Sequence, residues 1–226
     1  MAYFSKATFK FFTDLRKNNQ REWFQTHKPR YIKYVRDPFL QFIADVDHDL
    51  PSISKHYFGD SRANGGSLFR IYRDVRFSKD KTPYKTWAGV RFKHQDSATQ
   101  AAPTLYLHIQ PGNHFMGAGI WHPATPVVNQ IRDFIHNNPN AWNQLKQDKP
   151  FQDQYQLSGK SLKRMPRGYD AEHPLAEDLK RKDFVISTPL TDEQVLSEDF
   201  KKLFIRNSKI AAPFLDYLCA ALDLDF

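Results

Sequence analysis

The sequence predicts an α+β fold in which a central antiparallel sheet has helices from the N- and C-terminal segments packed on one face. Two features of the chain carry this prediction. Much of residues 1–58 and 125–226 places apolar side chains at helical spacing, whereas residues 67–122 alternate apolar and polar side chains as half-buried strands do. The short link at 111–114 suits a hairpin, and hairpins join antiparallel strands.

The length and composition of the chain fit one folded domain. Its 226 residues are 40% hydrophobic and 15% aromatic, enough to bury a sizeable core built from large rings. We therefore expect a single α+β domain over residues 1–226. Its helical N-terminal part covers about 1–58, its sheet about 67–122, and its helical and mixed C-terminal part about 125–226.

Two apolar stripes predict helices in the N-terminal part. Phe9, Phe12 and Leu15 mark the first stripe at a spacing of three residues. Because Asp37 and Pro38 suit the N-cap and the first turn of a helix, the second helix is predicted to kink or restart there. The second stripe consists of Tyr31, Val35, Phe39, Phe42, Ile43 and Val46.

Strand-like alternation follows and defines two faces of the predicted sheet. It places Phe69 and Ile71 on one face, with Arg70 and Tyr72 on the other. We expect the apolar face to pack on helices. The opposite face would then present Arg70, Tyr72, Trp87, Arg91, Tyr106 and His108.

Turn and capping residues divide the C-terminal part. Thr125 and Pro126 are predicted to begin a helix that the Asn-Asn-Pro run at 137–139 ends. Residues 184–190 are predicted as a strand or an extended arm. The capping-box pattern TDEQ at 191–194 is predicted to begin the C-terminal helices.

Nothing in the sequence indicates secretion, a membrane span or a disulfide. The first residues carry lysines within their apolar stretch and lack a signal-peptide pattern, and no stretch approaches about 18 consecutive apolar residues. The single cysteine, Cys219, lies among apolar residues at helical spacing and is predicted to be buried. We expect a cytoplasmic protein with no membrane partner and no cofactor, and the sequence does not define its oligomeric state.

Most of the positive charge is concentrated in one segment. The formal net charge is +8, and residues 62–93 alone contain nine basic residues against two acidic ones. Such a local excess predicts attraction to an anion. The predicted ligand-binding residues are Arg70, Tyr72, Arg73, Arg76, Lys79, Tyr84, Lys85, Trp87, Arg91, Tyr106 and Trp121.

These residues fit two interpretations. In one, they form a concave site in which guanidinium groups hold a small phosphorylated or carboxylated ligand while aromatic rings stack on it. In the other, Lys and Arg stems merely lie over aromatic rings on a half-exposed sheet. Arg76 and Lys79 need partners if they are buried, and Asp74 and Asp80 are close enough in sequence to supply them, so we expect part of the cluster to form structural salt bridges.

A third interpretation is a non-catalytic module whose basic face contacts RNA or an acidic protein partner. A sheet face that carries tyrosine, tryptophan and arginine is typical of base-stacking platforms. However, the core motif of RRM domains is missing, and the net charge outside residues 62–93 is only +1. A small anionic ligand therefore fits the sequence better than a long polyanion.

Motifs for catalysis or metal binding are sparse. The chain has no GxGxxG, GxxxxGK[ST], HExxH or GxSxG sequence. The His-Gln-Asp run at 94–96, with His108, His114 or His122 as a third ligand, is too short a pattern to predict a metal site. His108 is the candidate for proton transfer, because a neighbouring anion could raise its pKa, but a structural histidine fits the same position. The sequence does not separate an enzyme from a binding protein.

Four stretches of the chain form a recognisable pattern: NNQREWF (18–24), FRIYRDVRFSKDKTPYKTWAGVRF (69–92), LYLHIQPGNHFMGAGIWHP (105–123) and LKRMPRGYDAEHPLAEDL (162–179). Through them, nearly the whole chain resembles a mainly bacterial family catalogued as domain of unknown function 2461. The resemblance implies no reaction, because the family has no established one. It implies recurring residues without assigned roles, here Trp23, Phe24, Arg70, Tyr72, Arg73, Asp74, Arg76, Phe77, Asp80, Lys81, Pro83, Tyr84, Lys85, His108, Gly117, Gly119, Trp121, Arg167, Gly168 and Tyr169.

The resemblance also draws attention to the RMPRGYD stretch at 164–170. Arg164 and Arg167 could bring two further guanidinium groups to the predicted site. Alternatively, Pro166 and Gly168 only shape a turn there.

Overall fold

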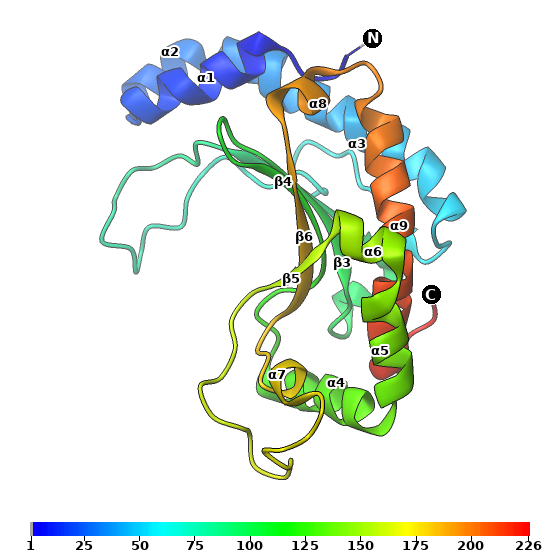
Figure 1. Cartoon of the computed structure of the whole chain (residues 1–226). Helices are drawn as coiled ribbons and strands as arrows, with labels where there is room; N and C mark the ends of the chain where they lie inside the picture. The colour runs from blue at the N-terminus through cyan, green and yellow to red at the C-terminus, as the bar shows by residue number, and fades with distance from the viewer. Residues whose placement is uncertain (1) are drawn as a thin grey trace.

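The computed structural model describes residues 2–226 and shows an antiparallel sheet with helices packed against it (Figure 1). Within these residues the sheet has six strands in the order β1-β2-β3-β4-β6-β5, and every neighbouring pair is antiparallel. The α+β prediction is thus confirmed. The strands are β1 (Tyr57–Phe58), β2 (Ala88–His94), β3 (Thr104–Ile109), β4 (His114–Ile120), β5 (Gln156–Ser158) and β6 (Phe184–Leu190).

The helices come from both ends of the chain, as expected. Those before the sheet are α1 (Lys6–Lys17), α2 (Arg21–Tyr31), the π-helical turn η1 (Ile32–Arg36), α3 (Asp37–Asp49) and the 3₁₀ turn η2 (Leu50–Ser52). A second 3₁₀ turn, η3 (Gln95–Ala98), lies between β2 and β3. The later helices are α4 (Thr125–Asn137), α5 (Pro139–Gln147), α6 (Lys149–Gln154), α7 (Ala176–Leu179), α8 (Asp192–Leu196) and α9 (Phe200–Ala221).

One face of the sheet forms the core together with α3 and α9. In β2 the side chains of Val90 and Phe92 are completely buried, whereas Arg91 between them is exposed. The rings of Phe42 on α3, Phe92 on β2 and Phe204 on α9 contact one another at centroid distances between 5.3 and 6.5 Å. Aromatic burial of this kind contributes much of the apolar area that holds the helices on the sheet.

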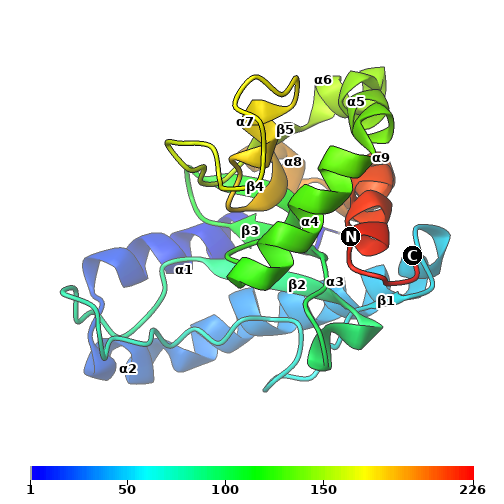
Figure 2. The same ribbon diagram turned by 90° about the horizontal axis from the view of Figure 1, so that it is seen from below.

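The opposite face, which we call the open face, is not covered by these helices. Figure 1 shows α3, α5, α6 and α9 on one side of the strands, while two long loops extend on the other side. The first loop, drawn in cyan, lies between β1 and β2, and the second, drawn in yellow-green, lies between β5 and α7. Figure 2, seen from below, shows the two loops at different places along the sheet. The open face is therefore bordered by two loops.

The segment before β2 differs from the predicted strand. Instead of a regular strand, residues 67–72 form isolated bridges from Leu68 to Val90 and from Tyr72 to Tyr84. Because Leu68 lies opposite Val90, which faces the core, the next residue, Phe69, turns to the open face. The prediction that Phe69 belongs to the apolar face is therefore wrong.

The sheet also extends beyond its predicted end at residue 122. Residues 184–190 were predicted as a strand or an extended arm, and they form β6, which pairs with the whole of β4. Three residues of β5, which the sequence did not indicate, add a short edge strand to β6. These strands come late in the chain, so only the long-range pairing with β4 reveals them.

Local helix signals were reliable. The helix predicted to restart at Asp37 and Pro38 does so, because α3 begins at Asp37 directly after the π-helical turn η1. The capping box at 191–194 is present, since the Thr191 hydroxyl accepts the Gln194 N–H at 3.1 Å. Cys219 is buried, as predicted. Among residues 2–226, no helix is long and apolar enough to cross a membrane.

We expect Gly119 to be required for the β4–β6 pairing. Its φ is +116°, and a Cβ atom there would lie 2.1 Å from the Phe184 carbonyl oxygen and 3.0 Å from the Phe214 ring. Replacing Gly119 by Ala should therefore lower the free energy of unfolding by clearly more than about 1 kcal/mol, measured by urea denaturation.

Gly112→Ala is the matched control for this prediction. Gly112 also has a positive φ, +81°, but nothing lies within 4 Å of the position that a Cβ atom would take there. Gly112→Ala should therefore lower the free energy of unfolding only by the backbone cost of a positive φ, roughly 1 kcal/mol. Equal losses for the two variants would show that the contact with β6 is unimportant.

Candidate functional site

Five ring side chains meet on the open face of the sheet and form what we call the aromatic cluster. Its members are Phe69, Trp87, Tyr106, His108 and Phe115. The His108 ring is stacked on Phe115 with centroids 4.7 Å apart, and its other neighbour is Trp87 at 4.8 Å. Strand pairing fixes this arrangement, because β3 lies between β2 and β4 and presents Tyr106 and His108 to both.

A glycine on β2 makes room for the cluster. A Cβ atom at Gly89 would lie 2.6 Å from the Tyr106 hydroxyl oxygen and 2.9 Å from the Trp87 ring. The Tyr106 ring can therefore lie against the β2 backbone only because residue 89 has no side chain.

His108 is buried within the cluster, and both of its ring nitrogens have partners. Nε2 lies 3.1 Å from the Gln110 side-chain oxygen, so it carries the proton, and Nδ1 accepts a hydrogen bond from the Tyr106 hydroxyl at 3.0 Å. Burial lowers the pKa of His108, although the hydrogen bond with Gln110 opposes this shift. Desolvation is the largest influence on the pKa of this ring.

Two cations lie over the aromatic cluster. The Lys85 ammonium is 5.3 Å from the Trp87 ring centroid, and the Arg91 guanidinium is 5.8 Å from that of Phe69. Lys85 also donates a hydrogen bond to the Arg70 carbonyl at 2.6 Å. Burial, followed by the positive charge of Arg70, lowers the pKa of Lys85.

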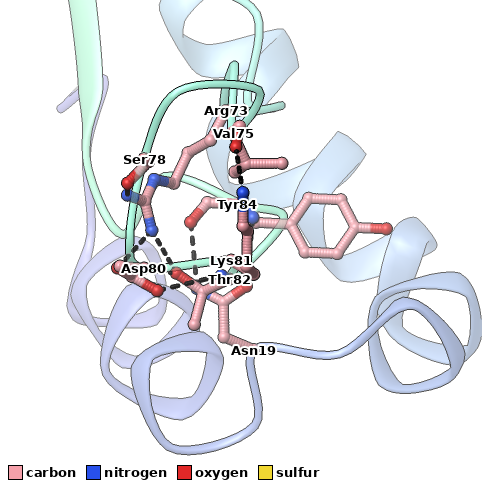
Figure 3. Close-up of polar contacts among 8 residues, drawn as sticks. All are labelled: Asn19, Arg73, Val75, Ser78, Asp80, Lys81, Thr82 and Tyr84. Atoms are coloured by element: carbon pink, nitrogen blue, oxygen red, sulfur yellow. Dashed lines mark hydrogen bonds and ion pairs between the residues drawn. The ribbon is translucent and has the colours of Figure 1, made fainter.

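Three other arginines of the basic segment, Arg62, Arg73 and Arg76, are neutralised by carboxylates of the chain. Arg62 pairs with Asp60 at 2.5 Å, and Arg76 pairs with Asp74 at 2.7 Å. Arg73 donates to the side chains of Asp80 and Thr82 (Figure 3). The salt bridge expected for Arg76 is thus present, with Asp74 as its partner, whereas Asp80 pairs with Arg73 instead of Lys79.

These contacts brace residues 73–83, which we call the basic arm. Hydrogen bonds from the Thr82 backbone and from Arg73 lower the pKa of Asp80 to about 2, so this carboxylate is ionised at neutral pH. The Lys81 ammonium donates a hydrogen bond to the Val75 carbonyl at 3.0 Å and so links the two halves of the arm. Much of the KDKTPYK pattern therefore holds the arm in shape.

The base of the basic arm is fastened to the N-terminal helices. The Asn19 side chain accepts the Tyr84 N–H at 3.0 Å and donates to the Tyr84 carbonyl at 2.9 Å. The Tyr84 ring is buried and stacked on Phe24 of α2, with centroids 4.2 Å apart. Tyr84 is therefore part of the core, and its predicted role as a wall of the ligand site does not agree with this burial.

The structure thus divides the predicted site residues into separate groups. Lys85, Trp87, Arg91, Tyr106 and His108 come together in or over the aromatic cluster. Tyr72 lies apart from them, with its ring near Tyr84 and Phe24, because its segment bends away after Phe69. The basic arm carries Arg73, Arg76 and Lys79, and Arg70 lies near Lys85. Trp121 follows the end of β4. Arg164 and Arg167 lie in the loop between β5 and α7.

Sequence reasoning missed Phe69, Phe115, Gly89 and Asn19. The alternation in HFMGAGIW could have placed Phe115 on the same face as Gly117. No local signal identifies Asn19 or Gly89, because their partners lie on other elements.

The histidines considered as metal ligands are each engaged separately. His94 Nε2 lies 2.8 Å from the Asp225 carbonyl oxygen, His114 Nε2 lies 2.9 Å from Asp192, and the His122 N–H donates to Asp183. In the part of the chain that the structure describes, no three His, Cys, Asp or Glu side chains are grouped to hold a metal ion.

Two surface hollows lie away from the open face. One is lined by residues between Asn140 and Lys149, and the other by residues between Gln194 and Arg206. Neither includes a residue of the aromatic cluster or of the basic arm, so neither supports the predicted ligand site.

The stability of the protein should fall as the pH drops below about 6.5. Burial lowers the pKa of both His108 and His114, so the unfolded chain binds more protons than the folded one in this range. Each histidine can add a slope of at most about 1.4 kcal/mol per pH unit. Urea denaturation between pH 7.5 and 5.5 measures the effect.

His108→Gln should reduce this pH dependence, because it removes one of the two buried imidazoles with a lowered pKa. If the unfolding free energy of the unmodified protein stays constant between pH 7.5 and 5.5, the lowered pKa of His108 and His114 is contradicted.

The sequence model of one family matches residues 7–217, nearly the whole chain. In the comparisons with curated proteins and with solved structures, no match reaches significance. The chain therefore belongs to the family described as "Conserved hypothetical protein (DUF2461)".

Proposed function

We propose that the open face binds a ligand that combines an anionic group with a flat ring, as a nucleotide does. The aromatic cluster supplies surfaces for the ring, and Lys85 and Arg91 supply positive charge beside it. The nucleotide unit can be a free small molecule or part of a single strand. Both sources present the same phosphate and the same base to the site.

The observation that carries this proposal is the division of the basic residues into paired and unpaired ones. Arg62, Arg73 and Arg76 each have a carboxylate partner in the chain. Within residues 2–226, no carboxylate lies within ion-pair distance of Arg70, Lys79, Lys85, Arg91 or Lys93. Unpaired cations beside aromatic rings suit an anion that is absent from the chain itself.

The cluster supports ring binding as well as anion binding. Phe69, Trp87, Tyr106 and Phe115 are only partly buried, although they pack against one another. Aromatic side chains on the uncovered face of an antiparallel sheet are well placed to stack on nucleobases. Lys85 and Arg91 occupy positions over Phe69 and Trp87, so a base fits best against Tyr106 and Phe115, with its phosphate toward the cations.

The contacts of His108 favour binding over proton transfer at this ring. Tyr106 and Gln110 occupy both nitrogens, and the lowered pKa keeps the ring neutral near pH 7. The neutral ring therefore serves to orient Tyr106 within the cluster. Proton transfer at His108 would first require one of these hydrogen bonds to break.

A thermal-shift screen tests this proposal. Uridine monophosphate and triphosphate should raise the melting temperature more than ribose 5-phosphate or succinate, because only the nucleotides add ring stacking to the anion contact. Equal shifts for all four compounds would support the small anionic ligand without a ring. No shift from any compound at millimolar concentration would count against the proposal.

Replacing Arg91 by Gln should weaken nucleotide binding, measured by isothermal titration calorimetry, by roughly threefold to tenfold, because it removes an unpaired cation beside the cluster. The matched control is Arg76→Gln, which removes the same charge from an arginine that Asp74 already neutralises. If both variants lose affinity equally, net charge rather than the open face determines binding.

A further inference from the structure

A second group of cations lies in the loop after β5, and an exposed aromatic ring follows the end of β4. Trp121 follows β4, six residues beyond Phe115, and its surface is 61% exposed. The loop after β5 carries Lys160, Lys163, Arg164 and Arg167, and residues 159–169 contain no acidic residue.

A buried carboxylate holds this loop beside Trp121. Asp183 accepts the His122 N–H and the Lys160 N–H, each at 2.8 Å, and its own side chain is fully enclosed. The start of the loop and the end of β4 are thus fixed to the same residue. Within residues 2–226, Lys160, Lys163, Arg164 and Arg167 have no carboxylate within ion-pair distance.

The two cationic ends lie on the same side of the sheet. Figure 1 shows the loop between β5 and α7 and the loop that contains the basic arm extending away from α9. Six residues of extended strand separate Phe115 from Trp121 by about 20 Å. Of the β4 residues between them, Met116, Ala118 and Ile120 belong to the core. Gly117 and Gly119 carry no side chain and are themselves buried, so the path runs over the residues of β3 and β6 that pair with them.

From this geometry we infer that the occupant of the open face is single-stranded nucleic acid that runs along β4 from the aromatic cluster to Trp121. This inference rests on the proposed function and specifies its ligand. A free nucleotide is too short to contact both ends, whereas a few consecutive nucleotides span them. The charge of the two ends is complementary to a phosphate backbone, and unpaired bases can stack on the aromatic rings.

Fluorescence anisotropy with a labelled twelve-nucleotide oligo(U) tests the inference. The oligonucleotide should bind at least about tenfold more tightly than uridine monophosphate, which serves as a competitor. Trp121→Ala should weaken oligonucleotide binding by about 5- to 150-fold, the effect of losing one stacked base, and leave uridine monophosphate binding unchanged. Arg164→Gln combined with Arg167→Gln should reduce the slope of log K against log salt by about 1.4.

The matched control is Phe77→Ala. Phe77 is 95% exposed on the basic arm, outside the path from Phe115 to Trp121, so its loss should leave the affinity unchanged. Melting curves of each variant show whether it is folded, and a folded Trp121→Ala protein with unchanged oligonucleotide affinity would overturn the path.

Other outcomes separate this inference from the proposed function. If uridine monophosphate binds as tightly as the oligonucleotide and responds to Arg91→Gln, the single-strand path is wrong and the nucleotide site stands. If neither ligand binds, the proposed function itself fails. If a duplex, or polyglutamate of equal charge, competes as well as the oligonucleotide, the surface recognises charge alone and the inference is overturned.

Discussion

The burial of one face of the antiparallel sheet under α3 and α9 is the constraint on which the rest of this structure depends. Side chains alternate across a strand, so burying Val90 and Phe92 commits Arg91 to the opposite side. The same alternation on β3 brings Tyr106 and His108 to that side. The open face and its aromatic cluster thus follow from the way the core is packed.

Ion pairing within the chain then determines which cations on this side of the sheet have a carboxylate partner. Surface ion pairs such as that of Arg76 with Asp74 contribute little to stability, because water already solvates both groups. Their main effect is to neutralise positive charge at the surface. Pairing of Arg62, Arg73 and Arg76 leaves Lys79, Lys85 and Arg91 as cations without a carboxylate partner in this segment.

Long-range anchors hold the loops that border the open face. The Asn19 side chain binds both backbone polar groups of Tyr84, and Asp183 binds the backbone of His122 and of Lys160. Such bonds satisfy backbone groups that no strand partner reaches. They give each loop a fixed starting point on the folded core.

The sequence by itself determined the fold class, the start of α3 and of α8, both ends of α4, the β2–β4 strands and the concentration of charge, because these depend on local periodicity, capping residues and composition. Only the tertiary structure decided that Phe69 faces outward, that Tyr84 is buried, that β5 and β6 complete the sheet, and which arginines are neutralised. Each of these outcomes depends on a partner far away in the sequence or on a bend in the backbone. Periodicity gives the spacing of side chains along one segment, whereas pairing between segments selects the face and the partner of each side chain.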